Sequence, residues 1–263
     1  MTAVDPVAKV EDLWEGYRIK TRRGWRAAGT HWALKGVNLT VAPGEALGVM
    51  GVNGSGKSTL LLCLSGVLSP DRGRIQTRGR VASLVDLSAG FSRELTGKEN
   101  ILMAGVLIGM SRDEVRRRYE AIADFAGLDP EVLDSPLRTY SAGMGLRIGF
   151  SLVVNSEPSV LLVDEVLAVG DQAFQNRCLR RVEELTRGGS GVVLVSHNLD
   201  LLRRECDRAV VLERGEVTYE GPTGEAVDFY LSSSDGDLRD QDLSHSAIYG
   251  RTARPRRRRL RHI

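Results

Sequence analysis

The chain has 263 residues, and its 36 basic and 34 acidic side chains give a net charge of +2 at pH 7. This balance gives no global sign of nucleic-acid binding, and 42% hydrophobic with 27% charged residues is typical of a soluble globular protein. The three cysteines, Cys63, Cys178 and Cys206, are far apart, which argues against a disulfide framework or zinc site and predicts buried free thiols. The longest apolar stretch, Ile101 to Met110, is too short to span a bilayer, and no signal peptide precedes it, so we expect a cytoplasmic chain.

The first informative segment, Gly51 to Thr59, reads GVNGSGKST and fits the phosphate-loop pattern G-x-x-x-x-G-K-[ST]. The apolar run Ala46 to Met50 before it predicts a buried strand, and Leu60 to Ser65 after it predicts a helix. Backbone N–H groups of such a loop, together with the positive end of the helix, bind polyphosphates. We expect Lys57 to contact the β- and γ-phosphates of a nucleotide and Ser58 to hold Mg²⁺. The expected nucleotide-binding residues are Gly51, Asn53, Gly54, Ser55, Gly56, Lys57, Ser58 and Thr59.

The stretch from about residue 91 to residue 155 predicts a helical subdomain inserted in an α/β chain. Thr96 to Glu99 and Ser111 to Glu114 are capping-box patterns, and each of them predicts the start of a helix. Apolar residues then recur at steps of three and four, as on one face of a helix. That face consists of Val115, Tyr119, Ile122 and Phe125. The opposite face, which we expect to be solvated, consists of Arg116, Arg117, Arg118 and Glu120.

A second apolar run, Ser159 to Glu165, reads SVLLVDE and predicts a buried strand that ends in two carboxylates. The carboxyl ends of such strands are where doubly wound folds bind their ligands. Asp164 is suited to hold Mg²⁺ through water, and Glu165 is suited to polarise an attacking water. The alternative is a solvated acidic turn, but the phosphate loop earlier in the chain favours the functional interpretation.

The segment Tyr140 to Met144, YSAGM, resembles the LSGGQ-like signature that opens a helix in ABC-type ATPases. The resemblance covers residues 7–231. It implies that the signature contacts the γ-phosphate of an ATP held by a second, identical subunit, so that a homodimer encloses two ATP molecules. The signature residues are Ser141, Ala142, Gly143 and Met144.

The same resemblance assigns roles to three further segments. Val192 to His197 is similar to the family's switch strand, which implies that His197 contacts the γ-phosphate and orients the water. Gly170 and Asp171 occupy the position of the D-loop. Tyr17 is the expected aromatic that stacks on adenine, with Trp25 and Trp32 as alternatives.

Three blocks together resemble the ATPase subunits of bacterial surface-polysaccharide, O-antigen and teichoic-acid exporters. They are YSAGM, DEVLAVGDQAFQNRC from Asp164, and DLSAGFSRELTGKEN from Asp86. This resemblance implies an α/β fold: a phosphate-loop ABC-type ATPase core with a RecA-like mixed sheet, helices on both faces and a small antiparallel β subdomain, plus the helical subdomain. No glutamine stands at the usual Q-loop position, and whether Asp86 replaces it at the metal stays open.

The resemblance also implies the function and the partners. We expect ATP and Mg²⁺ as cofactors, an integral membrane permease as partner around residues 86–108, lipid-linked glycan as cargo, and a peripheral location on the cytoplasmic face of the cell membrane. No specific nucleic acid is expected. The competing class is a soluble ABC ATPase of the repair or translation type, which the single phosphate loop and the lack of heptads or zinc spacing disfavour.

Two segments fall outside the expected catalytic core. Residues 18–31 are basic and predict a loop, either simply solvated or close to a membrane surface. Residues 1–231 form the expected ATP-binding domain, and residues 232–263 form a basic tail whose composition predicts disorder. Arginines in such a tail are attracted to anionic lipid.

Overall fold

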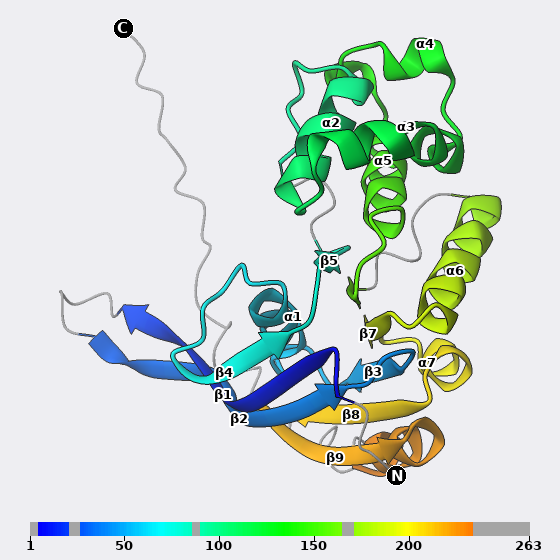
Figure 1. Cartoon of the computed structure of the whole chain (residues 1–263). Helices are drawn as coiled ribbons and strands as arrows, with labels where there is room; N and C mark the ends of the chain where they lie inside the picture. The colour runs from blue at the N-terminus through cyan, green and yellow to red at the C-terminus, as the bar shows by residue number, and fades with distance from the viewer. Residues whose placement is uncertain (1–4, 21–26, 86–89, 165–170, 234–263) are drawn as a thin grey trace, which may run out of the picture.

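The computed structural model describes residues 5–20, 27–85, 90–164 and 171–233 (Figure 1). The sequence-based expectations for Trp25, Asp86, Glu165, Gly170 and residues 234–263 of the basic tail lie outside these residues, whereas residues 232 and 233 end a helix. Within the described ranges the chain forms a mixed sheet, a small antiparallel sheet and a separate helical subdomain, which is the predicted fold class.

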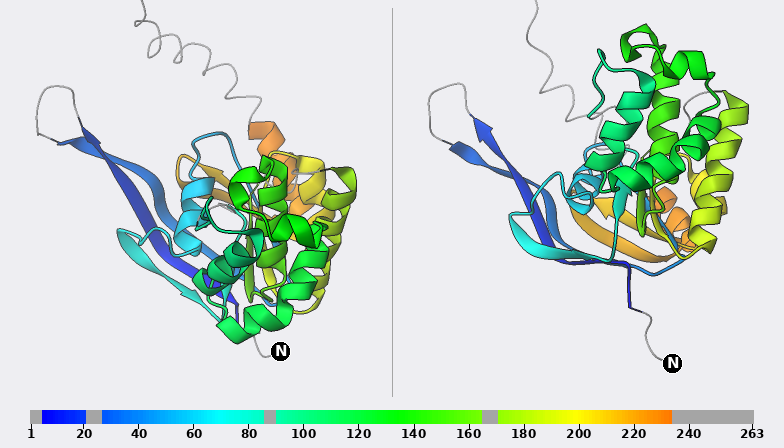
Figure 2. Two further views of the ribbon diagram at one scale, coloured as in Figure 1. Left: turned by 90° about the horizontal axis from the view of Figure 1, so that it is seen from above. Right: turned by 45° about the horizontal axis from the view of Figure 1, so that its top comes forward.

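The small antiparallel sheet has the strand order β2-β1-β4. Strand β1 (Ala8–Lys20) pairs with β2 (Ala27–Val41), and β4 (Arg72–Thr77) pairs with β1 only as far as Trp14. Beyond that point β1 and β2 continue as a two-stranded ribbon that projects from the molecule (Figures 1 and 2). The expectation of a loop is therefore wrong for the described residues 18–20 and 27–31, which belong to β1 and β2 and pair across the ribbon, with Tyr17 opposite His31 and Lys20 opposite Ala27.

The central sheet has six strands in the order β5-β6-β7-β3-β8-β9, all parallel except β9. Strands β3, β6 and β7 are apolar and buried along their whole length, as expected for strands covered on both faces, and β8 is buried except at Arg208 and Glu213. The strands expected at Ala46 to Met50, within Ser159 to Glu165 and near Val192 to His197 are all present. The bounds are β3 (Ala46–Met50), β5 (Val81–Ser83), β6 (Val160–Val163), β7 (Gly191–Val195), β8 (Arg208–Glu213) and β9 (Glu216–Pro222).

Alternate residues of each central strand enter two different hydrophobic cores. In β6, Val160 and Leu162 pack with the antiparallel sheet and helix α1 (Lys57–Leu64). Leu161 and Val163 pack on the other face, against α6 (Gln172–Arg187) and α7 (Leu199–Glu205). The sheet is thus covered on both faces, and a last helix over residues 223–233 adds to the second core.

The helical subdomain has its own core and lies at one end of the molecule (Figure 1). Both predicted capping boxes are present: Thr96 Oγ1 accepts from the Glu99 N–H at 3.2 Å, and Ser111 Oγ accepts from the Glu114 N–H at 3.1 Å. One side chain differs from expectation, since Arg118 binds Glu157 and the Asn155 carbonyl instead of facing solvent alone. The elements are α2 (Gly97–Leu107), α3 (Arg112–Ala126), α4 (Pro130–Leu133), the 3₁₀ helix η1 (Leu137–Thr139) and α5 (Ala142–Val154).

Among the described residues, none of the helices combines the length and the hydrophobicity that crossing a bilayer requires.

Candidate functional site

The phosphate loop lies between β3 and α1, and two of its glycines are required by its shape. Gly56, which caps α1, has a φ of 111°, and a Cβ there would lie 2.4 Å from the carbonyl oxygen of Ala33. Gly51 has a φ of 152°, and its Cβ would lie 2.1 Å from the Leu212 carbonyl oxygen. Only glycine combines this left-handed backbone with such close approach, so the loop curls tightly ahead of the helix.

Lys57 is the first residue of α1, and its side chain is buried against the loop. Its ammonium group donates to the carbonyl oxygens of Gly51 at 2.8 Å and Val52 at 2.9 Å. The positive charge is thereby held inside the loop, next to the N-terminus of α1. Both features attract a phosphate group to this point.

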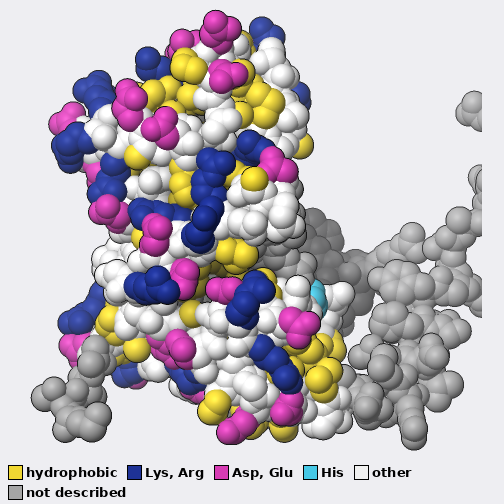
Figure 3. Space-filling view, turned by 90° about the vertical axis from the view of Figure 1, so that its right-hand side faces the viewer, with side chains coloured by type: hydrophobic (Ala, Val, Ile, Leu, Met, Phe, Trp, Pro, Cys, Tyr) yellow, Lys and Arg dark blue, Asp and Glu magenta, His cyan; other side chains and the backbone are white. Residues whose placement is uncertain are grey.

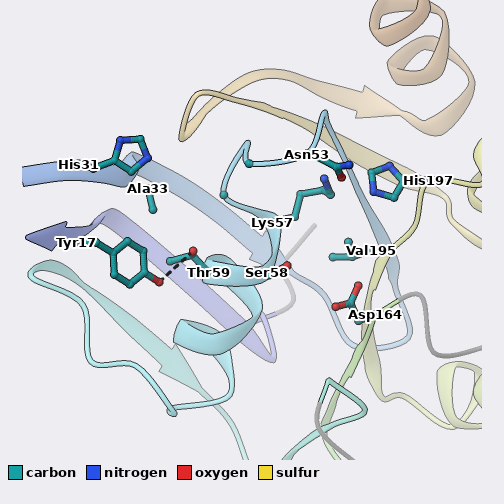
Figure 4. A pocket seen from close by; sticks show the side chains of 12 residues that line it. Tyr17, His31, Ala33, Asn53, Lys57, Ser58, Thr59, Asp164, Val195 and His197 are labelled. Atoms are coloured by element: carbon teal, nitrogen blue, oxygen red, sulfur yellow. Dashed lines mark hydrogen bonds between the residues drawn. The ribbon is translucent and has the colours of Figure 1, made fainter. Parts of the chain in front are cut away.

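A pocket of about 380 Å³ opens in front of this loop (Figure 4). Tyr17 and His31 lie at one end of it, Asp164 and His197 lie at the other, and Lys57 lies between them. Such an elongated site, aromatic at one end and charged at the other, is suited to a nucleoside polyphosphate. The lining residues are Tyr17, His31, Ala33, Asn53, Gly54, Gly56, Lys57, Ser58, Thr59, Asp164, Val195 and His197.

Asp164 and His197 reach the pocket because of the strand order. Asp164 follows β6 directly and His197 follows β7. Strand β7 lies between β6 and β3, parallel to both, and β3 leads into the phosphate loop. The carboxyl ends of the three strands therefore meet at one edge of the sheet, where α/β folds bind ligands. Residues separated by more than 100 positions in the chain become neighbours in this way.

Tyr17 is the candidate aromatic that the geometry favours for a base. The residue is 44% exposed, and its hydroxyl lies 3.4 Å from Thr59 Oγ1 at the start of α1. Trp32 packs instead edge-on against Trp14, with Arg72 over both rings, and does not line the pocket. Sequence reasoning missed His31 and Ala33 because it placed His31 in a loop; the pairing of Tyr17 with His31 in the ribbon brings them to the pocket.

The signature residues lie elsewhere on the surface and do not line this pocket. Ser141 caps α5, and its hydroxyl accepts from the Met144 N–H at 3.2 Å; Ala142, Gly143 and Met144 form the first turn. The result is an exposed helix N-terminus of the kind that binds anions.

Of the two residues assigned to the D-loop, Asp171 is described. One carboxylate oxygen accepts from the Phe174 N–H at 2.9 Å and caps α6, and the other accepts from Arg147 of α5. The hydrogen bond from Phe174 and the nearby Arg147 charge lower the pKa of Asp171 below its usual value. The carboxylate is thus ionised and doubly bound at neutral pH.

Comparison with known proteins gives concordant results. A family model described as ABC transporter matches residues 34–168. The chain is 44% identical to the ABC transporter protein AbcA of Aeromonas salmonicida, over 83% of this chain and 71% of that protein. It is 42% identical to the O-antigen export system ATP-binding protein RfbB of Klebsiella pneumoniae, over 75% of this chain and 80% of that protein. It is 37% identical to the teichoic acids export ATP-binding protein TagH of Lactiplantibacillus plantarum, over 83% of this chain but only 59% of that protein.

Solved structures agree on the fold. One described as the ATP-binding subunit of an ABC transporter superposes with a TM-score of 0.69 at 27% identity, covering 82% of this chain and 90% of that one. A dimeric ATP-binding cassette bound to ADP and phosphate superposes with the same TM-score of 0.69 at 22% identity. The match covers 82% of this chain and 98% of the cassette chain.

Proposed function

The chain belongs to the ABC transporter family, and we propose that it hydrolyses ATP to drive export of a lipid-linked cell-envelope polysaccharide or teichoic-acid-like polymer across the cytoplasmic membrane. One observation carries the proposal: Lys57 and Ser58 of the phosphate loop share a pocket with Asp164 and His197. The export names of relatives at 37% to 42% identity support the cargo class over a soluble repair or translation ATPase.

The residues in the pocket divide the work of hydrolysis. Tyr17 stacks on the adenine, the loop N–H groups hold the phosphates, and Lys57 stabilises the charge that develops on the transferred phosphoryl group. His197 orients the attacking water toward the γ-phosphate, and Glu165, which lies outside the described residues, polarises that water.

The site also fits Mg²⁺. The cation keeps several waters and takes one or two protein oxygens together with the substrate phosphates. Ser58 and Asp164 supply a hydroxyl and a carboxylate to the same pocket, and the described part of the chain has no group of three His, Cys, Asp or Glu residues that would favour another metal. When bound, Mg²⁺ neutralises phosphate charge, and Ser58 and Asp164 are the residues that would hold it.

A second copy of the chain completes the site. Because the signature residues lie away from the chain's own phosphate loop, Ser141 and Gly143 of one copy contact the γ-phosphate held by the other. Two copies related by a two-fold axis therefore enclose two ATP molecules.

A separate integral membrane permease binds the helical subdomain and carries the cargo, and the ATPase associates with the membrane from its cytoplasmic side. No specific nucleic acid is involved. On the face in Figure 3, basic and acidic side chains are interspersed and do not form a single-sign stripe, whereas a nucleic-acid footprint needs a concentrated basic surface.

The test is to purify the tagged chain from its native membranes in mild detergent and to identify by mass spectrometry what accompanies it. A multi-spanning permease is the expected partner, and the purified complex should hydrolyse ATP. Soluble nucleic-acid or ribosomal partners without a permease would overturn the export proposal and leave the ATPase assignment in place. Full turnover by Glu165→Gln would remove Glu165 as the group that polarises the water.

A further inference from the structure

The signature helix α5 is anchored to the rest of the chain just beyond its C-terminal end. Arg118 donates to the Asn155 carbonyl oxygen at 3.1 Å, and Arg80 donates to the carbonyl oxygen of Ser156. Both arginines also pair with Glu114 of the helical subdomain. These contacts join the end of α5 to the segment that leads into β6. None of these contacts involves the N-terminal end of α5, where Ser141 begins the helix.

In its middle, six residues after Ser141, α5 carries a second anchor. Arg147 donates to Asp171, the residue that caps α6, and its guanidinium carbon lies 5.1 Å from the centre of the Phe174 ring. Phe174 is only 2% exposed and packs against Phe150 of α5, with ring centres 5.8 Å apart. The guanidinium is therefore held by a carboxylate and an aromatic face at once, which fixes its position better than either contact alone.

The partner of Arg147 is itself rigidly placed. One Asp171 oxygen is bound to the Phe174 N–H in the first turn of α6, so the other oxygen has a defined direction. Residues 165–170 alone separate Asp171 from Asp164, which lines the nucleotide pocket. Phe174 of α6 and Val163 of β6 also belong to one hydrophobic core, and β6 ends next to Asp164. The helix that Asp171 caps is therefore packed against the strand that leads to the chain's own nucleotide pocket.

We infer that Arg147 is a positioning residue: through Asp171 it fixes the signature end of α5 relative to the chain's own nucleotide pocket, and so aligns Ser141 with the nucleotide of a second copy. The inference rests on the proposed ATPase dimer for its catalytic consequence. The geometric part, a fixed orientation of α5, does not depend on it. Arg147 lies six residues from Ser141, about 9 Å along a helix, so an angular error at this anchor becomes a displacement at the signature.

Kinetics of purified variants test the catalytic consequence. Because a misplacement of about 1 Å can cost up to about 100-fold in rate, we expect Arg147→Ala to lower kcat by about 10- to 100-fold. Nucleotide affinity of the monomer should stay within about 2-fold, since Lys57 and the loop are untouched, and the Hill coefficient for ATP should fall toward about 1. Arg147→Lys should restore part of kcat, because it keeps the charge but loses the planar fork.

Asp171→Asn separates the two roles of the carboxylate. Asparagine caps helices as well as aspartate does, so α6 should keep its cap while the charge that binds Arg147 is lost. This variant should resemble Arg147→Ala in kcat. The matched control is Arg187→Ala on the same helix α6, which removes an exposed ion pair with Glu183 and should leave kcat unchanged.

A distance measurement tests the orientation without relying on activity. Spin labels on Glu120→Cys in α3 and Gln76→Cys in β4 report the helical subdomain against the antiparallel sheet, and both positions are exposed. Arg147→Ala should broaden the distance distribution, and Arg187→Ala should not. An unchanged distance distribution in Arg147→Ala would overturn the inference. An active Arg147→Ala protein with unchanged kcat and Hill coefficient would also overturn it. So would a loss of activity in Arg147→Ala that is fully explained by a smaller amount of folded protein. A wild-type chain without ATPase activity would refute the proposed function instead. The distance between the spin labels would still show whether Arg147 fixes the orientation of α5.

Discussion

The guanidinium of Arg80 and the carboxylate of Glu114 form two parallel hydrogen bonds, each of 2.9 Å. Arg80 precedes β5 of the central sheet, whereas Glu114 lies in the first turn of α3, so the pair joins the core to the helical subdomain. The side chains are only 21% and 20% exposed, and Arg80 also donates to the Gly109 carbonyl at 3.0 Å. The hydrogen bond from Arg80 lowers the pKa of the Glu114 carboxyl, as expected of a charge-assisted pair.

Arg80→Ala should therefore destabilise the protein more than loss of a typical surface ion pair. It leaves a partly buried carboxylate without its main partner, and the free energy of unfolding should fall by about 2 to 3 kcal/mol. Denaturant unfolding measures the change. Arg116→Ala, which removes an exposed pair with Asp113 one turn along α3, is the control and should cost less than about 0.5 kcal/mol. Equal effects of the two variants would show that the junction adds nothing beyond a surface pair.

Gly56→Ala should disrupt both the phosphate loop and the fold around it. The φ of 111° already disfavours a side chain, and the Cβ would lie 2.4 Å from the Ala33 carbonyl oxygen. We expect a loss of at least about 2 kcal/mol in stability, together with loss of ATP binding by calorimetry. Gly224→Ala, at a helical position with open space, should change stability by no more than about 0.5 kcal/mol. A Gly56→Ala protein that binds ATP normally would contradict the described loop shape.

Lys57→Ala should weaken nucleotide binding by about 10- to 100-fold, because charge-assisted hydrogen bonds contribute about 1.5 to 3 kcal/mol each. Fluorescent-nucleotide titration measures the affinity, and Lys35→Ala, which removes a lysine paired with Glu216, is the control. Undiminished affinity in Lys57→Ala would mean that the phosphates bind elsewhere.

The three cysteine thiols should be unreactive in the folded protein. Burial raises the pKa of Cys63, Cys178 and Cys206 from about 9 to about 12. A thiol reagent at about pH 8 should therefore react slowly with native protein and with all three thiols after unfolding. Rapid labelling of the native protein would show that the buried thiols become accessible to the reagent without global unfolding.

The same shifts set the sign of an alkaline pH dependence. A raised pKa means that the folded state binds the thiol proton more tightly than the unfolded state does. The stabilising contribution is complete below about pH 9 and is lost as the pH rises toward 12. The free energy of unfolding, measured from about pH 8 upward, should fall through this pH window. Cys206→Ala removes one of the three thiols and should reduce the slope of the unfolding free energy against pH.

Local sequence was sufficient for the features whose physics is local. The capping boxes at Thr96 and Ser111 depend on side chains that reach only to the third residue ahead, and both are present in the structure. The glycine loop before Lys57 and the apolar strands that flank it likewise depend on short patterns. The resemblance to ABC-type ATPases, which rests on such patterns, is confirmed by the matching family model.

The contacts between residues far apart in the chain became known only from the tertiary structure. Pairing across the β1–β2 ribbon replaced an expected loop and placed His31 beside Tyr17, and no local pattern signals such pairing in a polar segment. Arg118 was expected to face solvent, yet Glu157 lies 39 residues away in the chain and within reach in space. The bond from Arg147 to Asp171 spans 24 residues and exists only because α5 and α6 pack around Phe174. Short-range chemistry thus determined which residues can bind phosphate, and long-range packing determined how the signature helix is held beside them.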